Sequence, residues 1–225
     1  MLCFLLPLLV GCSVASSGQS ATLTVQHAPQ NTTTYVAIGA SDTFGIGSDD
    51  PTTESWPADL ASQLGSKVRL VNLGIPGVTV ENALPVELPV ALDAHPSLVT
   101  IWLAVNDLAD NIPIATYAHD LDQIISQLQA ANPQLRIAVA NIPDLTLLPH
   151  FSSTNPQTLR AQTAAYNQQI ATIVQRHHVL LVDLSQYGQE LASHPEYISS
   201  DGFHPSTLGY ARIASIFYQV LQEKA

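Results

Sequence analysis

Five short apolar runs, rich in β-branched residues, alternate with longer segments that have helical periodicity. The runs occupy residues 35–39, 67–73, 97–104, 135–140 and 179–184. Continuous apolar runs of this length are typical of strands that are buried on both faces of a parallel sheet. Because strand and helix alternate about five times, the sequence predicts an open, doubly wound α/β sheet.

The segments between the runs repeat their apolar residues at helical spacing. Two of them carry apolar stripes, formed by Leu121, Ile124, Ile125 and Leu128 and by Tyr166, Ile170, Ile173 and Val174. A further helix is expected after Ser55, a candidate N-cap, with Pro57 in its first turn. A last helix is expected from about Ser206 to Gln222.

An excess of acidic residues restricts the possible partners. The chain has 7 Lys plus Arg against 18 Asp plus Glu, which gives a net charge of −11. Nucleic acid and anionic lipid both require a basic face, so we expect the chain to bind neither by charge. Its 225 residues are 46% hydrophobic and 11% charged, which predicts one domain with a full core, or at most two small ones.

The N-terminus has the character of an export signal. Residues 1–11, MLCFLLPLLVG, are uncharged and mostly apolar, and the stretch is too short to span a bilayer as a helix. The tetrapeptide LVGC, which ends at Cys12, resembles the lipobox of bacterial lipoproteins. That resemblance implies cleavage before Cys12, lipidation of this cysteine and anchoring to the bacterial cell envelope. The alternative is an ordinary secretory signal with an incidental cysteine, and a secreted protein.

Two consequences follow for the organisation of the chain. Cys3 leaves with the signal and Cys12 carries lipid, so we expect no disulfide in the mature chain. Residues 12–34 then contain the lipidated cysteine and a flexible tether that is rich in Ser, Thr, Gln and Ala. The folded domain is expected over residues 35–225, and we expect it to be a monomer.

Polar and glycine-rich residues stand at the ends of the expected strands. Ser41 follows the first run, residues 72–77 (NLGIPG) end the second, Asn106 and Asp107 follow the third, and residues 201–205 (DGFHP) come after the last. The carboxyl ends of parallel strands meet at one edge of the sheet, where open α/β sheets bind their ligands. The four stretches are therefore expected to lie together.

Together these stretches hold the residue types that acyl transfer requires. Ser41 can act as the nucleophile and His204 as its base, and Asp201 can hold the second ring nitrogen of His204. The backbone N–H groups of Ser41 and Gly77 and the side-chain amide of Asn106 can stabilise an oxyanion. Asp107 is expected to be structural. The adjacent pair His177-His178 is not expected to bind metal, because no supporting ligand spacing is present.

The four stretches resemble the sequence blocks of the GDSL, or SGNH, hydrolases, in the same order over residues 35–210. GASDT resembles the serine block, NLGIPG the glycine block, VND the asparagine block and DGFHP the Asp-x-x-His block, with weaker matches at 141–146 and 166–170. The resemblance implies the flavodoxin-like SGNH fold, a three-layer α/β/α sandwich with a mostly parallel five-stranded sheet. It also implies a serine esterase or lipase with no cofactor and no metal.

Two of the blocks depart from the family pattern. Ala40 stands where the family has an aspartate before the serine, and Ala104-Val105 stand where it has two glycines. We expect looser hydrogen bonding around Ser41 and a reshaped pocket floor. Asp42 and the pair Asp49-Asp50 are expected to belong to a solvated loop.

Three functions remain open on the sequence. The first is hydrolysis of short acyl or acetyl esters, small or linked to polysaccharide. The second is a lipid-tethered binding module without catalysis, and the third is acyl transfer to a sugar hydroxyl. Residues 144–156 form the longest candidate for a wall over the site, and their apolar side chains either line an acyl pocket or pack inward; these are Leu145, Leu147, Leu148 and Phe151.

Overall fold

The computed structural model describes residues 32–223. The expected signal at residues 1–11, Cys12 and most of the expected tether lie outside the described residues. The first strand begins at Thr33, two residues before the expected run at 35. Within residues 32–223, none of the helices combines the length and the apolar character that crossing a membrane requires.

Five parallel strands form a single sheet in the order β2-β1-β3-β4-β5. The strands are β1 (Thr33–Gly39), β2 (Val68–Asn72), β3 (Leu98–Trp102), β4 (Arg136–Ala140) and β5 (Leu180–Val182). Each lies within an expected run or begins shortly before it, so the predicted α/β architecture is confirmed. The chain reverses its direction of travel across the sheet between β1 and β3, which is the usual ligand position in such sheets.

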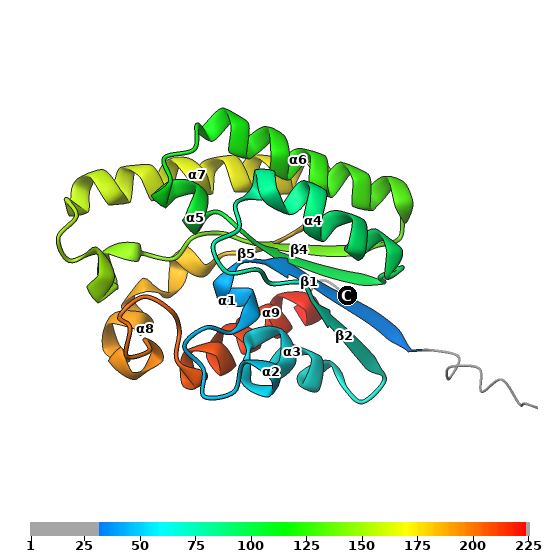
Figure 1. Cartoon of the computed structure of the whole chain (residues 1–225), viewed down its shortest axis with the longest axis horizontal. Helices are drawn as coiled ribbons and strands as arrows, with labels where there is room; N and C mark the ends of the chain where they lie inside the picture. The colour runs from blue at the N-terminus through cyan, green and yellow to red at the C-terminus, as the bar shows by residue number, and fades with distance from the viewer. Residues whose placement is uncertain (1–31, 224–225) are drawn as a thin grey trace, which may run out of the picture. The chain divides into compact units, whose positions relative to one another are not determined.

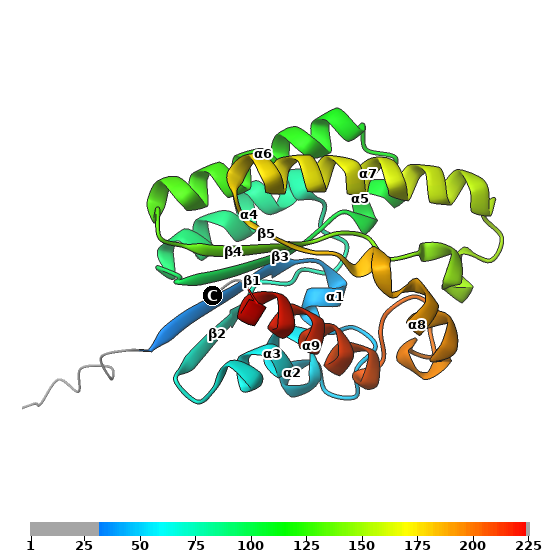
Figure 2. The ribbon, with the colours of Figure 1, turned by 180° about the vertical axis from the view of Figure 1, so that it is seen from behind.

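Helices cover both faces of the sheet (Figures 1 and 2). On one face lie α4 (Val80–Asp93), α6 (Ile114–Ala131) and α7 (Pro156–His177), and on the other lie α2 (Pro51–Glu54), α3 (Trp56–Leu64) and α9 (Thr207–Glu223). Short elements gather near the carboxyl ends of the strands. They are α1 (Ser41–Phe44), α5 (Val105–Ala109), η1 (Leu145–Leu147), η2 (Pro149–Phe151), η3 (Leu184–Tyr187), α8 (Gly188–Ser193) and η4 (Pro195–Tyr197).

The core has two parts, one on each side of the sheet. The predicted stripes of α6 and α7 are buried in the part that faces α4, α6 and α7. The second part packs α3 and α9 on the sheet, where the Trp56 ring stacks on Phe217 with centroids 4.2 Å apart. This burial of aromatic and aliphatic surface on both faces holds the strand ends in place.

Two local expectations differ from the structure. All five strands were expected to be buried on both faces, and β1, β3 and β4 are mostly buried. The side chains of β2 and β5 are largely half-buried, because these two strands form the edges of the sheet. Ser55 occupies the N-cap position of α3, but its hydroxyl makes no capping hydrogen bond. The buried hydroxyl has no hydrogen-bond partner within the described part of the chain.

Candidate active site

Ser41 lies at the point where β1 turns into α1. The turn is tight, since a side chain at Gly39 would overlap with Thr43 and with the carbonyl oxygen of Trp102. Ser41 is buried, with 7% of the residue exposed. Because β1 is a central strand beside the reversal of the sheet, Ser41 is held on a rigid part of the fold.

The structure brings Ser41, His204 and Asp201 into one hydrogen-bonded chain. His204 Nε2 lies 2.9 Å from Ser41 Oγ, and His204 Nδ1 lies 2.6 Å from Asp201 Oδ2. A neutral imidazole that donates from Nδ1 to the carboxylate leaves Nε2 free to accept the serine proton. The three predicted catalytic residues therefore have the geometry that proton abstraction from serine needs.

Asp201 is fixed as a carboxylate by its own turn. Its Oδ1 accepts hydrogen bonds from Ser199 Oγ and Phe203 N, both at 2.8 Å, and from His204 N at 3.0 Å. Partial burial raises the pKa of Asp201, but the hydrogen bonds from His204, Phe203 and Ser199 outweigh burial and hold the pKa well below its usual value. Asp201 is therefore ionised at neutral pH and in mildly acidic solution.

The other predicted site residues lie on the loops that follow β2 and β3. Gly77 is exposed with φ of +79°, a conformation that favours glycine, and no atom lies within 4 Å of the place of a Cβ. Asn106, in α5, donates from Nδ2 to the Val78 carbonyl at 2.9 Å. This bond joins the two loops and uses one of the two amide hydrogens, so one hydrogen remains for a ligand.

The NLGIPG stretch also supports the serine turn. Asn72 Nδ2 donates to the Thr43 carbonyl at 2.7 Å, and Gly74 N donates to Asn72 Oδ1 at 2.9 Å. A Cβ at Gly74 would overlap with the backbone nitrogen of Phe44. Gly74 therefore permits close backbone contact between the β2–α4 loop and α1.

Ala104 and Asp107 flank Asn106 and hold its loop. Ala104 is buried with φ of +153°, a backbone conformation that residues with a side chain rarely adopt. The Asp107 carboxylate accepts from Val80 N at 3.2 Å, at the start of α4. Burial raises the pKa of Asp107 to about 6, although the hydrogen bond from Val80 N lowers it. The contact agrees with the structural position expected for Asp107.

A family comparison decides the relationship that these stretches suggest. The model of the GDSL-like Lipase/Acylhydrolase family matches residues 37–212. The chain belongs to this family. A comparison with curated protein sequences finds no match to this GDSL-family chain.

Solved structures of known proteins share the fold of this GDSL-family domain. A lipase/acylhydrolase from Enterococcus faecalis has a TM-score of 0.69 at 21% identity, covering 85% of this chain and 96% of its own. A family 3 carbohydrate esterase from Clostridium thermocellum has a TM-score of 0.68 at 23% identity, with 86% and 96% covered. An acetyl xylan esterase has a TM-score of 0.65 at 14% identity, with 84% and 99% covered.

The residues around Ser41 differ from the four letters of the family name. Where the name reads Gly-Asp-Ser-Leu, this GDSL-family chain has Gly39-Ala40-Ser41-Asp42. Ala40 is buried. A hydrogen bond beside this position comes from Glu87 of α4, whose Oε2 accepts from Gly39 N at 2.9 Å; the expected loosening around Ser41 stays a prediction. No local sequence pattern points to Glu87, because only the packing of α4 on β1 brings it there.

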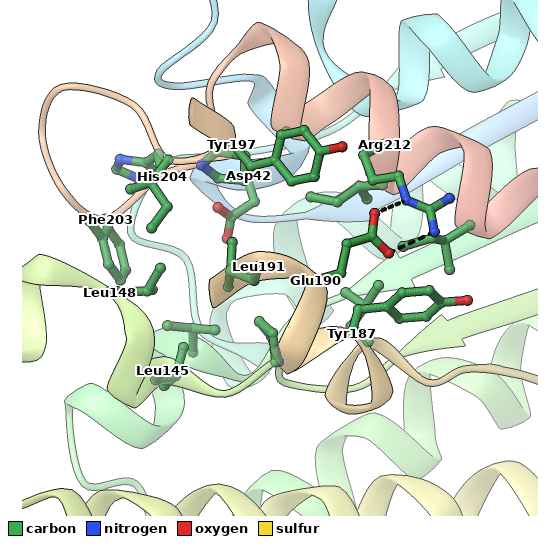
Figure 3. Close-up of a pocket in the computed structure, with 18 of the residues that line it drawn as sticks. Asp42, Leu145, Leu148, Tyr187, Glu190, Leu191, Tyr197, Phe203, His204 and Arg212 are labelled. Atoms are coloured by element: carbon green, nitrogen blue, oxygen red, sulfur yellow. Dashed lines mark hydrogen bonds and ion pairs between the residues drawn. The ribbon is translucent and has the colours of Figure 1, made fainter. Parts of the chain in front are cut away.

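The prediction that Asp42 belongs to a solvated loop is wrong. Asp42 lies in α1, is half-buried and points into a cavity beside the site (Figure 3). Burial raises the pKa of Asp42 to about 6, while the nearby His204 lowers it and Asp201 raises it. The residue turns inward because α1 begins directly at the end of β1.

The cavity beside the site measures about 100 Å³, and its wall is almost entirely apolar. Sequence reasoning missed it, because the largest share of its wall comes from the connection between β5 and α9. Of the loop expected as a wall, Leu145 and Leu148 do line the cavity, whereas Leu147 and Phe151 do not. Within residues 32–223 no group of three or more His, Cys, Asp or Glu side chains is placed to hold a metal ion.

Proposed function

We propose that the chain is a serine esterase of the GDSL type that hydrolyses carboxylic esters, with short acyl or acetyl groups favoured. One observation carries the proposal: the Ser41 Oγ–His204 Nε2 distance of 2.9 Å, with Asp201 on the other ring nitrogen at 2.6 Å. Family membership supports a hydrolase. The fold shared with the carbohydrate esterase and the acetyl xylan esterase is compatible with acetyl esters.

In the proposed acylation step, Ser41 Oγ attacks the ester carbonyl carbon and its proton passes to His204 Nε2. The carbonyl electron pair moves onto oxygen, which receives hydrogen bonds from the backbone N–H groups of Ser41 and Gly77 and from Asn106 Nδ2. Collapse of this intermediate expels the alcohol, which takes the proton from His204. The product is an ester of Ser41 with the acyl group.

In the deacylation step, water attacks the acyl-Ser41 carbonyl and gives its proton to His204 Nε2. Collapse then releases the carboxylic acid, and the proton returns to Ser41 Oγ. Asp201 remains ionised throughout and stabilises the imidazolium formed in each step. Acyl transfer differs only in the second step, where a sugar hydroxyl takes the place of water.

A fluorophosphonate probe tests the nucleophile directly. The wild type is expected to take up one label and the Ser41→Ala variant none, with kcat for p-nitrophenyl acetate lowered by roughly 10⁶-fold in the variant. Equal labelling of the two proteins, or no labelling of the wild type, would sink the esterase proposal and favour the binding module. A p-nitrophenyl ester series from C2 to C16 then measures the preferred acyl length.

We also propose that Cys12 carries lipid and anchors the protein to the cell envelope; the LVGC sequence motivates this. Expression in a bacterium with radiolabelled fatty acid tests the anchor. We expect label and membrane association in the wild type and neither in Cys12→Ser. A wild-type protein that is released unlabelled contradicts the anchor and favours an ordinary secretory signal.

A further inference from the structure

The cavity beside the Ser41 site is built from two connections and α9. Leu145 and Leu148 come from the β4–α7 connection, Tyr187, Leu191 and Tyr197 from the β5–α9 connection, and Ile213 from α9. Figure 3 shows these elements around one hollow. Apolar cavities of about 150 Å³ bind molecules as large as benzene, so a cavity of about 100 Å³ holds a group of a few heavy atoms.

Asp42 brings a charge into this apolar space. Its carboxylate points into the cavity toward Leu191 (Figure 3), and no other side chain among residues 32–223 hydrogen-bonds to it. Its own backbone N–H donates to it, but a carboxylate in apolar surroundings with so little compensation is unfavourable, whereas a cation or a further hydrogen-bond donor beside it removes most of that penalty. The cavity therefore suits a positively charged or hydrogen-bond-donating group.

The other charges in the wall cancel each other. Arg212 of α9 donates to both carboxylate oxygens of Glu190, with Nη2 2.9 Å from Oε2. Its guanidinium also lies over the Tyr187 ring, 5.2 Å from the centroid. With His204 neutral, ionised Asp42 leaves the cavity with one unbalanced negative charge, in a wall that also holds the rings of Tyr187 and Tyr197, and aromatic faces attract cations.

The position of His204 indicates which half of an ester enters the cavity. Asp42, Val105 and His204 line the cavity, whereas Ser41, Gly77 and Asn106 do not, so the cavity meets the site at His204. In ester hydrolysis the histidine delivers its proton to the leaving alcohol oxygen. That oxygen therefore lies against His204, and the rest of the alcohol extends from there.

We infer that the cavity binds the leaving alcohol of the ester, and that the preferred alcohol carries a cationic amine that pairs with Asp42. The inference rests on the proposed ester hydrolysis and adds the substrate class: acyl esters of small amino alcohols. Asp42 is then the residue that determines specificity for the alcohol, and the walls formed by Leu191 and Tyr197 limit its size.

Two esters of the same shape test the inference. They are 2-(dimethylamino)ethyl acetate, protonated at pH 7, and 3-methylbutyl acetate, in which a CH replaces the nitrogen. The wild type is expected to prefer the amine in kcat/KM by roughly tenfold or more, about the effect of one partly buried ion pair. Asp42→Asn keeps the shape and is expected to bring the ratio to about one. Asp42→Leu is expected to reverse it.

Two results would overturn the inference. One is a wild-type ratio at or below one, where the ratio is kcat/KM for the amine ester divided by kcat/KM for 3-methylbutyl acetate. This result overturns the inference even if 2-hydroxyethyl acetate is preferred over propyl acetate. The other is an amine preference that Asp42→Asn leaves intact. An equal loss of both rates in Asp42→Asn is a form of this second result, and it means that Asp42 acts on His204 and not on the alcohol. Leu191→Phe is an independent check, expected to lower kcat/KM for 3-methylbutyl acetate relative to methyl acetate.

A binding measurement separates this inference from the proposed hydrolysis. NMR titration of the Ser41→Ala variant with 2-(dimethylamino)ethanol and with 3-methylbutanol requires no turnover. Tighter binding of the amine, with shifts at Asp42 and Tyr197, supports the cavity assignment even if the wild type hydrolyses no ester. Hydrolysis of p-nitrophenyl acetate without an amine preference in either assay leaves the esterase proposal standing and removes this inference.

Discussion

Glu87 Oε2 accepts a hydrogen bond from Gly39 N at 2.9 Å, two residues before the candidate nucleophile Ser41. Glu87 is 1% exposed, and its side-chain Oε1 has no hydrogen-bond partner among residues 32–223. Burial raises the pKa of Glu87 from 4.5 to about 8, although the hydrogen bond from Gly39 lowers it. A largely neutral carboxylic acid therefore holds the end of β1 at neutral pH.

Replacing Glu87 is expected to change how stability depends on pH. Above pH 4.5 the unfolded chain releases the Glu87 proton, while the folded protein keeps this proton up to about pH 8. The contribution of Glu87 to the free energy of unfolding is thus fully present below pH 4.5 and is lost as the pH rises to 8. The unfolding free energy of wild type should fall relative to that of Glu87→Gln by roughly 3 kcal/mol between pH 5 and 8. Denaturant titrations at several pH values measure the unfolding free energy of both proteins. If the two free energies change with pH in parallel, Glu87 is not a neutral acid in the folded protein.

Asp201→Asn tests the orienting role proposed for Asp201. An amide at this position accepts from His204 Nδ1 less well and can donate to it, which favours the wrong tautomer of the imidazole. We expect kcat for p-nitrophenyl acetate to fall by roughly 10⁴-fold with little change in KM. Circular dichroism and the melting temperature control for folding. A loss below tenfold in a folded variant means that Asp201 does not orient the base.

Asn106→Ala tests the proposed oxyanion donor. Because the amide hydrogen acts on charge that develops in the transition state, kcat should fall by about 10²–10³-fold while KM changes little. Asn82→Ala is the matched control, since Asn82 is an exposed amide in α4 whose side chain donates to Thr79 Oγ1. A mainly raised KM, or an equal loss in the control, speaks against the oxyanion role.

Ala104→Gly is expected to stabilise the protein. Ala104 has φ of +153°, where glycine avoids the steric cost of a Cβ, and relief of that strain is worth about 1 kcal/mol. Ala109→Gly in the same short helix has no strain to relieve and should lose up to about 1 kcal/mol. Urea unfolding compares the two variants. If both glycines destabilise equally, the Ala104 backbone is not strained.

Gly74→Ala is expected to disturb Ser41 from a distance. The added methyl would overlap with the Phe44 backbone nitrogen and push α1 away from the β2–α4 loop, at a cost of roughly 1–3 kcal/mol. We expect lower stability together with at least a tenfold lower kcat. Gly188→Ala is the control, because its Cβ meets only ordinary contacts, the nearest at 3.6 Å. An active, stable Gly74→Ala would rule out this close contact.

The strands could be predicted to within one or two residues at their start, because an apolar β-branched run is a local signal. The helix α4 could not be predicted, because Pro85 and Pro89 interrupt its apolar pattern. Both prolines lie on its exposed face, and the burial of Ala83 and Leu88 holds the helix together. The candidate site could be predicted because its residues directly follow strands in a parallel sheet, where topology alone brings them to one edge.

What the sequence could not predict depends on packing across the fold. Glu87 is an ordinary helix residue until α4 lies on β1, and Asp42 is one acid in a polar turn until the β5–α9 connection closes over it. The cavity is the space left between that connection, α9 and the β4–α7 connection. Such features have no periodicity and no motif, and they follow only from the positions of side chains that are distant in the chain.

The hydrogen bond between Ser41 and His204 joins residues 163 positions apart. A growing chain on the ribosome contains Ser41 early, but it acquires its base only after all five strands have been synthesised. A nascent fragment that ends before residue 204 lacks the base, so it contains no serine activated by His204. Reactivity toward an active-site label thereby reports completed synthesis and folding of the domain.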